Sequence, residues 1–147
     1  MRGDGFITLA DGTARWGKFG AAGVLVRSGE HVFVAQRSLH CHNGGTWAIP
    51  GGALDLHETP LEGALREFAE EIGHHLADYE VVTVFEDDHG GWSYWTIVLE
   101  LAAPFEAPTD LHWETAATAW VRPDELAAME LFPAFRVTLG HLGVLSD

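Results

Sequence analysis

Residues Gly52–His74 read GALDLHETPLEGALREFAEEIGH and contain the most complete set of local structural signals in the chain. Thr59 is a good helix N-cap, Pro60 fits the first helical position, and Glu62 can close a capping box with Thr59. Gly73 supplies a stop signal. The apolar residues between these ends recur at helical spacing, namely Leu61, Ala64, Leu65, Phe68, Ala69 and Ile72. The stretch therefore predicts an amphipathic helix.

Three carboxylates lie beside the apolar stripe of this predicted helix. At about 100° per residue, Glu67, Glu70 and Glu71 fall within about 100° of one another. Like charges at these spacings destabilise a helix, so they occur on a solvated face or where a cation neutralises them. Carboxylate oxygens in this number suit Mg²⁺ or Mn²⁺ rather than zinc. Gly63, one turn before Glu67, would leave room beside the acids for an ion or a phosphate.

The joint spacing of these residues resembles the Nudix box. That pattern runs from a glycine through a glutamate to an Arg-Glu pair, a Glu-Glu pair and a closing glycine. The matching positions are Gly52, Glu58, Arg66, Glu67, Phe68, Glu70, Glu71 and Gly73. His74 departs from the pattern because the family has an aliphatic residue there, which is expected to pack after the helix. An ordinary acidic helix would explain each residue singly but not their spacing.

The resemblance covers nearly the whole chain and implies an α/β fold, a three-layer α/β/α sandwich with a mixed sheet. The order of the expected strands and helices suggests the same arrangement. The implied activity is divalent-metal-dependent hydrolysis of a pyrophosphate bond in a nucleoside diphosphate linked to another group. A nucleoside triphosphate, cleaved to monophosphate and pyrophosphate, is the favoured substrate. The alternatives are ADP-ribose or another nucleoside-diphosphate derivative and, in a different class, a non-catalytic module that senses a nucleotide.

By resemblance, the acids of the box hold Mg²⁺ or Mn²⁺ and form the catalytic group. Glu67, Glu70 and Glu71 are the expected ligands, and the Gly51 carbonyl joins them. Glu58 is expected to be an outer ligand or a brace for the loop before the helix. Metal ions can act on a pyrophosphate as charge sink, template and water activator together.

Residues around the acids complete the expected site. Arg66 is expected to orient carboxylates by a forked ion pair, and its alternative is a solvent-exposed pair. Glu114, which precedes the expected strand at 117–121, is an additional metal ligand or the general base, or simply an acid in a solvated loop. The base could equally be a glutamate of the box. Arg37 could contact a substrate phosphate or pair with an acid, and Gly51 and Gly52 let the backbone approach one.

Composition limits the class of partner. The chain of 147 residues is expected to form one domain, with a loose N-terminal segment at residues 1–15 as one option. A net charge of −14 with eight Lys and Arg argues against a nucleic-acid polymer as partner, and a phosphorylated substrate then requires a cation. No apolar run resembles a signal peptide or approaches the ~20 residues that span a bilayer, so we expect a cytoplasmic protein without a membrane partner. Monomer and homodimer both stay open.

The remaining elements follow from apolar runs and turn residues. The Glu86–Gly91 segment is expected to be a polar turn, and Pro50–Gly52 a glycine loop after a short strand at 47–49. The other expected strands are 21–27, 31–36, 79–85, 92–101 and 117–121, and the other expected helices begin at Pro123 and at Pro133, the latter ending at Leu142.

Overall fold

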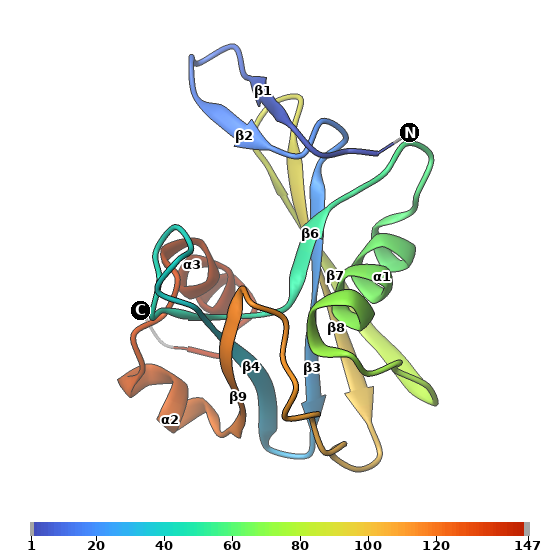
Figure 1. Ribbon diagram of the computed structural model, residues 1–147, viewed down its shortest axis with the longest axis vertical. Coiled ribbons are helices and arrows are strands. Elements are labelled where there is room, and N and C mark those ends of the chain that lie inside the picture. The colour runs from blue at the N-terminus through green and yellow to red at the C-terminus, as the bar shows by residue number, and fades with distance from the viewer. Residues whose placement is uncertain (1, 146–147) are drawn as a thin grey trace.

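The computed structural model describes residues 2–145 and places one helix against one face of a sheet and two helices against the other (Figure 1). The strands are β1 (Phe6–Thr8), β2 (Ala14–Trp16), β3 (Ala21–Ser28), β4 (His31–Arg37), β5 (Trp47–Ala48), β6 (Gly51–Ala53), β7 (Tyr79–Asp88), β8 (Ser93–Leu101) and β9 (Thr115–Val121). The helices are α1 (Pro60–Ile72), α2 (Pro123–Ala128) and α3 (Pro133–His141).

Seven of the strands form one mixed sheet with the order β5-β4-β3-β8-β7, to which β6 and β9 add by pairing with β3 and β4. β3 and β8 are parallel, and the other pairs are antiparallel. β3 changes partner along its length, because Ala21–Gly23 pair with β6 whereas Arg27 and Ser28 pair with β4. The sheet therefore splits at its centre, where β6 leads the chain towards α1.

Two apolar clusters hold the three layers together. On one face, Phe68 and Ile72 of α1 are fully buried against residues of β3, β4 and β8. On the other face, Phe135 and Leu139 of α3 and Leu126 of α2 pack against a second set of strand residues. Burying each such side chain contributes roughly 1.5–3 kcal/mol. The three-layer sandwich with a mixed sheet is confirmed.

The helix α1 has the ends that its sequence predicts. The Thr59 side chain accepts the Glu62 N–H at 3.1 Å, and the Glu62 carboxylate accepts the Thr59 N–H at 2.9 Å, which completes the capping box. Gly73 ends the helix with a left-handed φ of 78°. His74, the departure from the box pattern, stacks on Phe105 with ring centroids 4.3 Å apart, so an aromatic contact takes the place of aliphatic packing.

The expectation for Gly63 was wrong. A Cβ at this position would collide with the Leu54 side chain and lie 2.9 Å from Glu58 Oε1. Gly63 is buried, and its lack of a side chain lets the loop before α1 pack closely on the helix. The space beside Gly63 is therefore filled by the protein and does not accommodate an ion.

Two expected loops are strands. β6 contains Gly51 and Gly52, which the sequence predicts as part of a loop, because glycine weakens any strand signal. β7 continues to Asp88 through the expected polar turn, since Glu86, Asp87 and Asp88 pair with the first residues of β8. The reversal itself occupies only the residues between Asp88 and Ser93.

The N-terminal segment contains a short hairpin that the sequence does not predict. β1 and β2 form a hairpin in which Phe6 pairs with Trp16 and Thr8 with Ala14. Asp11 accepts the Thr13 N–H at 2.9 Å in the turn between the strands. Each strand has three residues, which is too short for alternation to reveal it. Met1 lies outside the described residues.

The remaining boundaries differ from the expectations by one or two residues. β9 begins at Thr115 rather than Ala117, and α3 ends at His141 rather than Leu142. Among residues 2–145, no helix has both the length and the apolar character needed to cross a membrane.

Candidate active site

One arginine on α1 organises the acids of the box. Arg66 Nε donates to Glu58 Oε2 at 2.8 Å and Nη2 to Glu58 Oε1 at 2.9 Å, a forked ion pair. Arg66 Nη1 also contacts Glu67 at 2.9 Å and Glu70 at 3.4 Å. The hydrogen bonds from Arg66 lower the pKa of Glu58, and those to Glu58 raise the pKa of Arg66. Arg66 therefore fixes one carboxylate firmly and holds two others more loosely.

Two further contacts tie Arg66 to the loop before the helix. Nη2 donates to the Ala53 carbonyl at 3.0 Å, and Nε lies 3.6 Å from Asp55 Oδ2. Asp55 also accepts the Gly3 N–H at 3.0 Å, and this bond is the largest cause that lowers the pKa of Asp55. Glu58 Oε1 accepts the Asp55 N–H at 2.9 Å. The N-terminal segment, β6 and α1 thus meet at one network of charges.

Glu67 lies against the glycines of β6. A Cβ on Gly52 would lie 2.5 Å from the Glu67 carboxyl carbon, so only glycine leaves space for the carboxylate there. Burial is the largest influence on this group and raises the pKa of Glu67 despite its contact with Arg66. The Glu67 carboxylate is consequently more costly to keep charged than one in solvent.

Glu71 points to the same part of the sheet but does not contact Arg66. Its Oε2 accepts the Gly51 N–H at 3.3 Å, and its Oε1 accepts the Thr115 hydroxyl at 3.3 Å. Burial raises the pKa of Glu71 to about 7, and the negative charges of Glu114 and Glu67 add to the rise. A nearby cation would offset this cost and keep Glu71 ionised.

The structure places Glu114 near Glu71 and Arg37 elsewhere. The Glu114 carboxylate influences the pKa of Glu71, and its Oε1 lies 3.4 Å from His112 Nδ1. Arg37 Nε donates to the His42 carbonyl at 2.8 Å, and its guanidinium lies over the Phe132 ring at 5.1 Å. Within residues 2–145, Arg37 forms no ion pair, so the alternative of a surface salt bridge is not observed.

The donor chemistry of this group fits a divalent cation, although the side chains are not gathered around one point. Glu67, Glu70 and Glu71 offer hard oxygen ligands, and β6 offers a glycine backbone next to two of them. In the part of the chain that the structure describes, no three Asp, Glu, His or Cys side chains are arranged to hold a metal ion. The contacts of Arg66 with Glu67 and Glu70 account for this arrangement, and those two carboxylates would have to turn away from Arg66 to bind a cation.

The structure brings three further residues to this region, and sequence reasoning missed two of them, Asp55 and Thr115. Asp55 joins the Arg66 network, Thr115 donates to Glu71, and the Tyr94 hydroxyl lies beside Gly51. Burial, and then the charge of Glu71, raise the pKa of Tyr94. None of the three belongs to a motif, and only the strand pairing brings Tyr94 close to β6.

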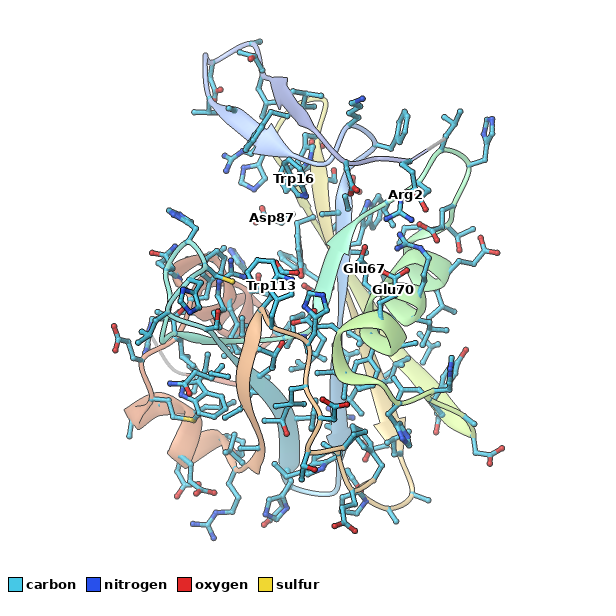
Figure 2. The ribbon with its side chains drawn as sticks, in the orientation of Figure 1. Arg2, Trp16, Glu67, Glu70, Asp87 and Trp113 are labelled. Carbon is cyan, nitrogen blue, oxygen red and sulfur yellow. The ribbon has the colours of Figure 1, made fainter. Side chains whose placement is uncertain are left out.

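Figure 2 shows the spatial arrangement of the labelled side chains. Glu67 and Glu70 lie on α1 to one side of β6, and in this view Asp87 and Trp113 lie on the other side. Trp113 is 66% exposed, although it is one of the largest apolar side chains in the protein.

Comparison with known proteins gives a consistent assignment. The sequence model of the NUDIX domain matches residues 17–139. The chain is 38% identical over 153 aligned residues to the putative 8-oxo-dGTP diphosphatase 3 of Mycobacterium tuberculosis, covering 95% of this chain and 69% of that protein. A shorter match, 53% identical over 53 residues, covers 36% of this chain and 47% of an 8-oxo-dGTP diphosphatase of Proteus vulgaris.

The solved structures agree with the sequence matches. The crystal structure of RenU, a Nudix hydrolase from M. smegmatis, superimposes with a TM-score of 0.85 at 35% identity, covering 95% of this chain and 92% of that one. The chain therefore belongs to the Nudix hydrolase family, and it is a pyrophosphohydrolase. The resemblance first seen in the box helix is confirmed.

Proposed function

We propose that this protein hydrolyses a nucleoside triphosphate to the monophosphate and pyrophosphate in a reaction that depends on Mg²⁺ or Mn²⁺. The observation that carries the proposal is the position of Glu71, a buried carboxylate that reaches the Gly51 N–H from the same helix that presents Glu67 and Glu70. Small nucleotides are the substrates of its Nudix relatives, and Nudix hydrolases generally use divalent metals.

The chain's own residues supply the ligands and their support. Glu67, Glu70 and Glu71, with the Gly51 carbonyl, would hold the cation, and Glu58 and Glu114 lie at the margins of this set. A cation held by these residues would supply neutralisation of phosphate oxygens and activation of water. Arg66 holds Glu58 and the loop in place, which fixes the helix relative to β6. Charge balance supports the proposal, because a chain of net charge −14 repels a nucleotide unless a cation intervenes.

Among triphosphates, we propose an oxidised purine deoxynucleotide, 8-oxo-dGTP, as the substrate to test first. This choice rests on relatives named 8-oxo-dGTP diphosphatase, one of which matches 95% of the chain. ADP-ribose and other nucleoside-diphosphate derivatives are the alternative within the family. Structures related to those substrates resemble this one at 17–18% identity, which supports the fold alone.

A hydrolysis screen tests the proposal. Purified protein is incubated with 8-oxo-dGTP, the ordinary nucleoside triphosphates, ADP-ribose and dinucleoside polyphosphates, each with Mg²⁺, with Mn²⁺ and with a chelator. We expect monophosphate and pyrophosphate from a triphosphate with either metal and no turnover with the chelator. Nucleotide binding without turnover on every substrate would instead favour a sensing module, and turnover of ADP-ribose alone would replace the proposed substrate.

A further inference from the structure

The face of the sheet opposite α1 carries a polar group near the ends of β7 and β8, made of Asp87, His89 and Tyr94. None of these three residues belongs to the proposed catalytic set. Ile97 and Leu99 of β8 pack in the same apolar cluster as α1. Because successive side chains of a strand alternate between its faces, Tyr94, three residues before Ile97, lies on the other face. Asp87 of β7 pairs directly with Tyr94, and directly opposed side chains project from the same face. Asp87 Oδ2 lies 3.1 Å from His89 Nε2, so the two groups form a polar pair beside Tyr94.

The Tyr94 hydroxyl lies close to the backbone that contacts the catalytic glutamate. A Cβ on Gly51 would lie 3.0 Å from the hydroxyl oxygen, and one on Gly23 would collide with it. These glycines therefore give the ring its space. The Gly51 N–H in turn donates to Glu71 at 3.3 Å. The Tyr94 hydroxyl, a hydrogen-bond donor, therefore lies next to the backbone that contacts Glu71.

The charged groups on the two sides of Tyr94, the α1 acids and Asp87, indicate which end of a nucleotide would bind on each side. Under the proposed function the phosphates would lie at the acids of α1, where a bound cation would reverse the local charge. The Asp87 carboxylate repels a phosphate but accepts hydrogen bonds from N–H and O–H groups. Its side chain is 33% exposed and remains accessible beside His89. A neutral nucleoside with ring N–H donors suits this side, and Tyr94 falls at the junction of nucleoside and phosphates.

We propose that Tyr94 and Asp87 bind the nucleoside end of the substrate, with the Tyr94 hydroxyl donating to the phosphate nearest the nucleoside and Asp87 accepting a hydrogen bond from the base. This inference rests on the proposed function, because it assumes a nucleotide with its phosphates at α1. It assigns the choice of base to a strand pair outside the box helix.

Tyr94→Phe tests the first contact, with Tyr79→Phe as its matched control. Tyr79 is the other tyrosine of the chain and packs with the apolar cluster on the α1 face. Loss of a hydrogen bond to a charged oxygen should raise KM for nucleoside triphosphates about tenfold, with kcat and the Mg²⁺ dependence unchanged. Tyr79→Phe should leave KM within twofold of wild type. A KM for Tyr94→Phe equal to that of Tyr79→Phe would overturn this contact.

Asp87→Asn tests the second contact, with Asp88→Asn as control. Asp88 is exposed on the same strand and accepts the Gly90 N–H through Oδ1, which asparagine retains. Exchanging an acceptor-only group for an amide should change the ratio of kcat/KM between guanine and adenine nucleotides about tenfold, whereas Asp88→Asn should not. An unchanged base preference in Asp87→Asn would overturn the assignment.

A binding experiment separates this inference from the proposed function. Calorimetry measures the dissociation constant of a triphosphate analogue with methylene groups in place of its bridging anhydride oxygens. If the wild type binds this analogue but cleaves no nucleotide, the proposed function fails while Tyr94→Phe and Asp87→Asn still test the nucleoside site. Weaker binding by both variants, by about tenfold, supports the inference. Binding equal to that of the two controls, or a wild type that binds no nucleotide, contradicts it.

Discussion

The acids around α1 and the polar group at the tip of β7 and β8 differ in how their charges are balanced. On α1, one arginine faces Glu58, Glu67 and Glu70, so negative charge is in excess. At the tip, His89 lies between the Asp87 carboxylate and Arg15, whose Nη2 is 3.4 Å from His89 Nδ1. The Asp87 carboxylate thus has a histidine and an arginine within reach on its own side of the tip, whereas three acids share one arginine at α1. The comparison supports the proposals that phosphates and a metal lie at α1 and that a neutral group lies at the tip.

The two regions also differ in mechanical support. α1 is capped at both ends and buries one whole face. The tip is held to the N-terminal hairpin by few contacts, among them the hydrogen bond from Trp92 Nε1 to the Gly17 carbonyl at 3.0 Å and Arg15 over the Trp92 ring at 5.7 Å. We therefore expect substitutions on α1 to have the larger effects on both stability and turnover.

Glu71→Gln should have the largest effect of any single substitution. It removes a buried charge next to Gly51 while preserving the shape of the side chain, so the fold should persist. Metal-dependent turnover should fall roughly 100-fold or more, within the range for groups that act in the chemical step. Steady-state kinetics and circular dichroism measure the two quantities. Unchanged turnover would remove Glu71 from the site.

Arg66→Met should be the most destabilising change on the α1 side. It leaves Glu58 and Glu67 without their partner, and their side chains are only 14% and 19% exposed. Breaking a buried pair costs about 3–5 kcal/mol, and partial exposure reduces this to roughly 2–3 kcal/mol of unfolding free energy. Urea denaturation measures the loss. Arg122→Met, which breaks the exposed ion pairs with Asp124 and Glu125, is the control, and we expect its cost to stay below about 1 kcal/mol.

Glu114→Gln tests whether Glu114 is a metal ligand or general base, or only an acid in a solvated loop. The negative charge of Glu114 acts on Glu71, so its removal should lower the pKa of Glu71 and change turnover. If Glu114 binds the metal or the attacking water, kcat should fall about tenfold or more. A wild-type rate would return Glu114 to the role of a solvated acid paired with His112.

Trp92→Phe should have the smallest effect and tests the other region. The substitution removes the bond to the Gly17 carbonyl but keeps an aromatic ring near Arg15. A lost hydrogen bond of this kind costs about 0.5–1.5 kcal/mol. Hydrogen exchange should increase in β1 and β2 and remain unchanged in α1. Faster exchange in α1 as well would show that the two regions are coupled, contrary to the comparison.

The sequence predicts α1 closely because each of its signals is local. The capping residues, the apolar stripe and the stop at Gly73 lie within one helix and need no distant partner. The Arg66 contact with Glu70 follows from the same spacing, whereas its contact with Glu58 depends on how the loop before the helix folds back. By contrast, Gly51 and Gly52 are in a strand only because β3 pairs with them, and the position of Tyr94 beside Gly51 depends on the parallel pairing of β3 and β8.

Short strands and packing account for the other differences. The hairpin of β1 and β2 has too few residues to show a period, and β7 extends through acidic residues because β8 offers it a partner. Gly63 illustrates a different limit. Its spacing places it one turn before Glu67, but the sequence does not show that Leu54 and Glu58 fill the space beside it.

The most direct test of the account is a Mn²⁺ titration followed by electron paramagnetic resonance on three proteins. Wild type, Glu67→Gln and Glu62→Gln are compared at equal concentration with the triphosphate analogue present. Glu62 is an exposed residue of the capping box, and glutamine can keep that box. We predict that Glu67→Gln weakens Mn²⁺ binding at least about tenfold and that Glu62→Gln binds as wild type does. Equal Mn²⁺ affinity in all three proteins would contradict the claim that the α1 acids hold the metal.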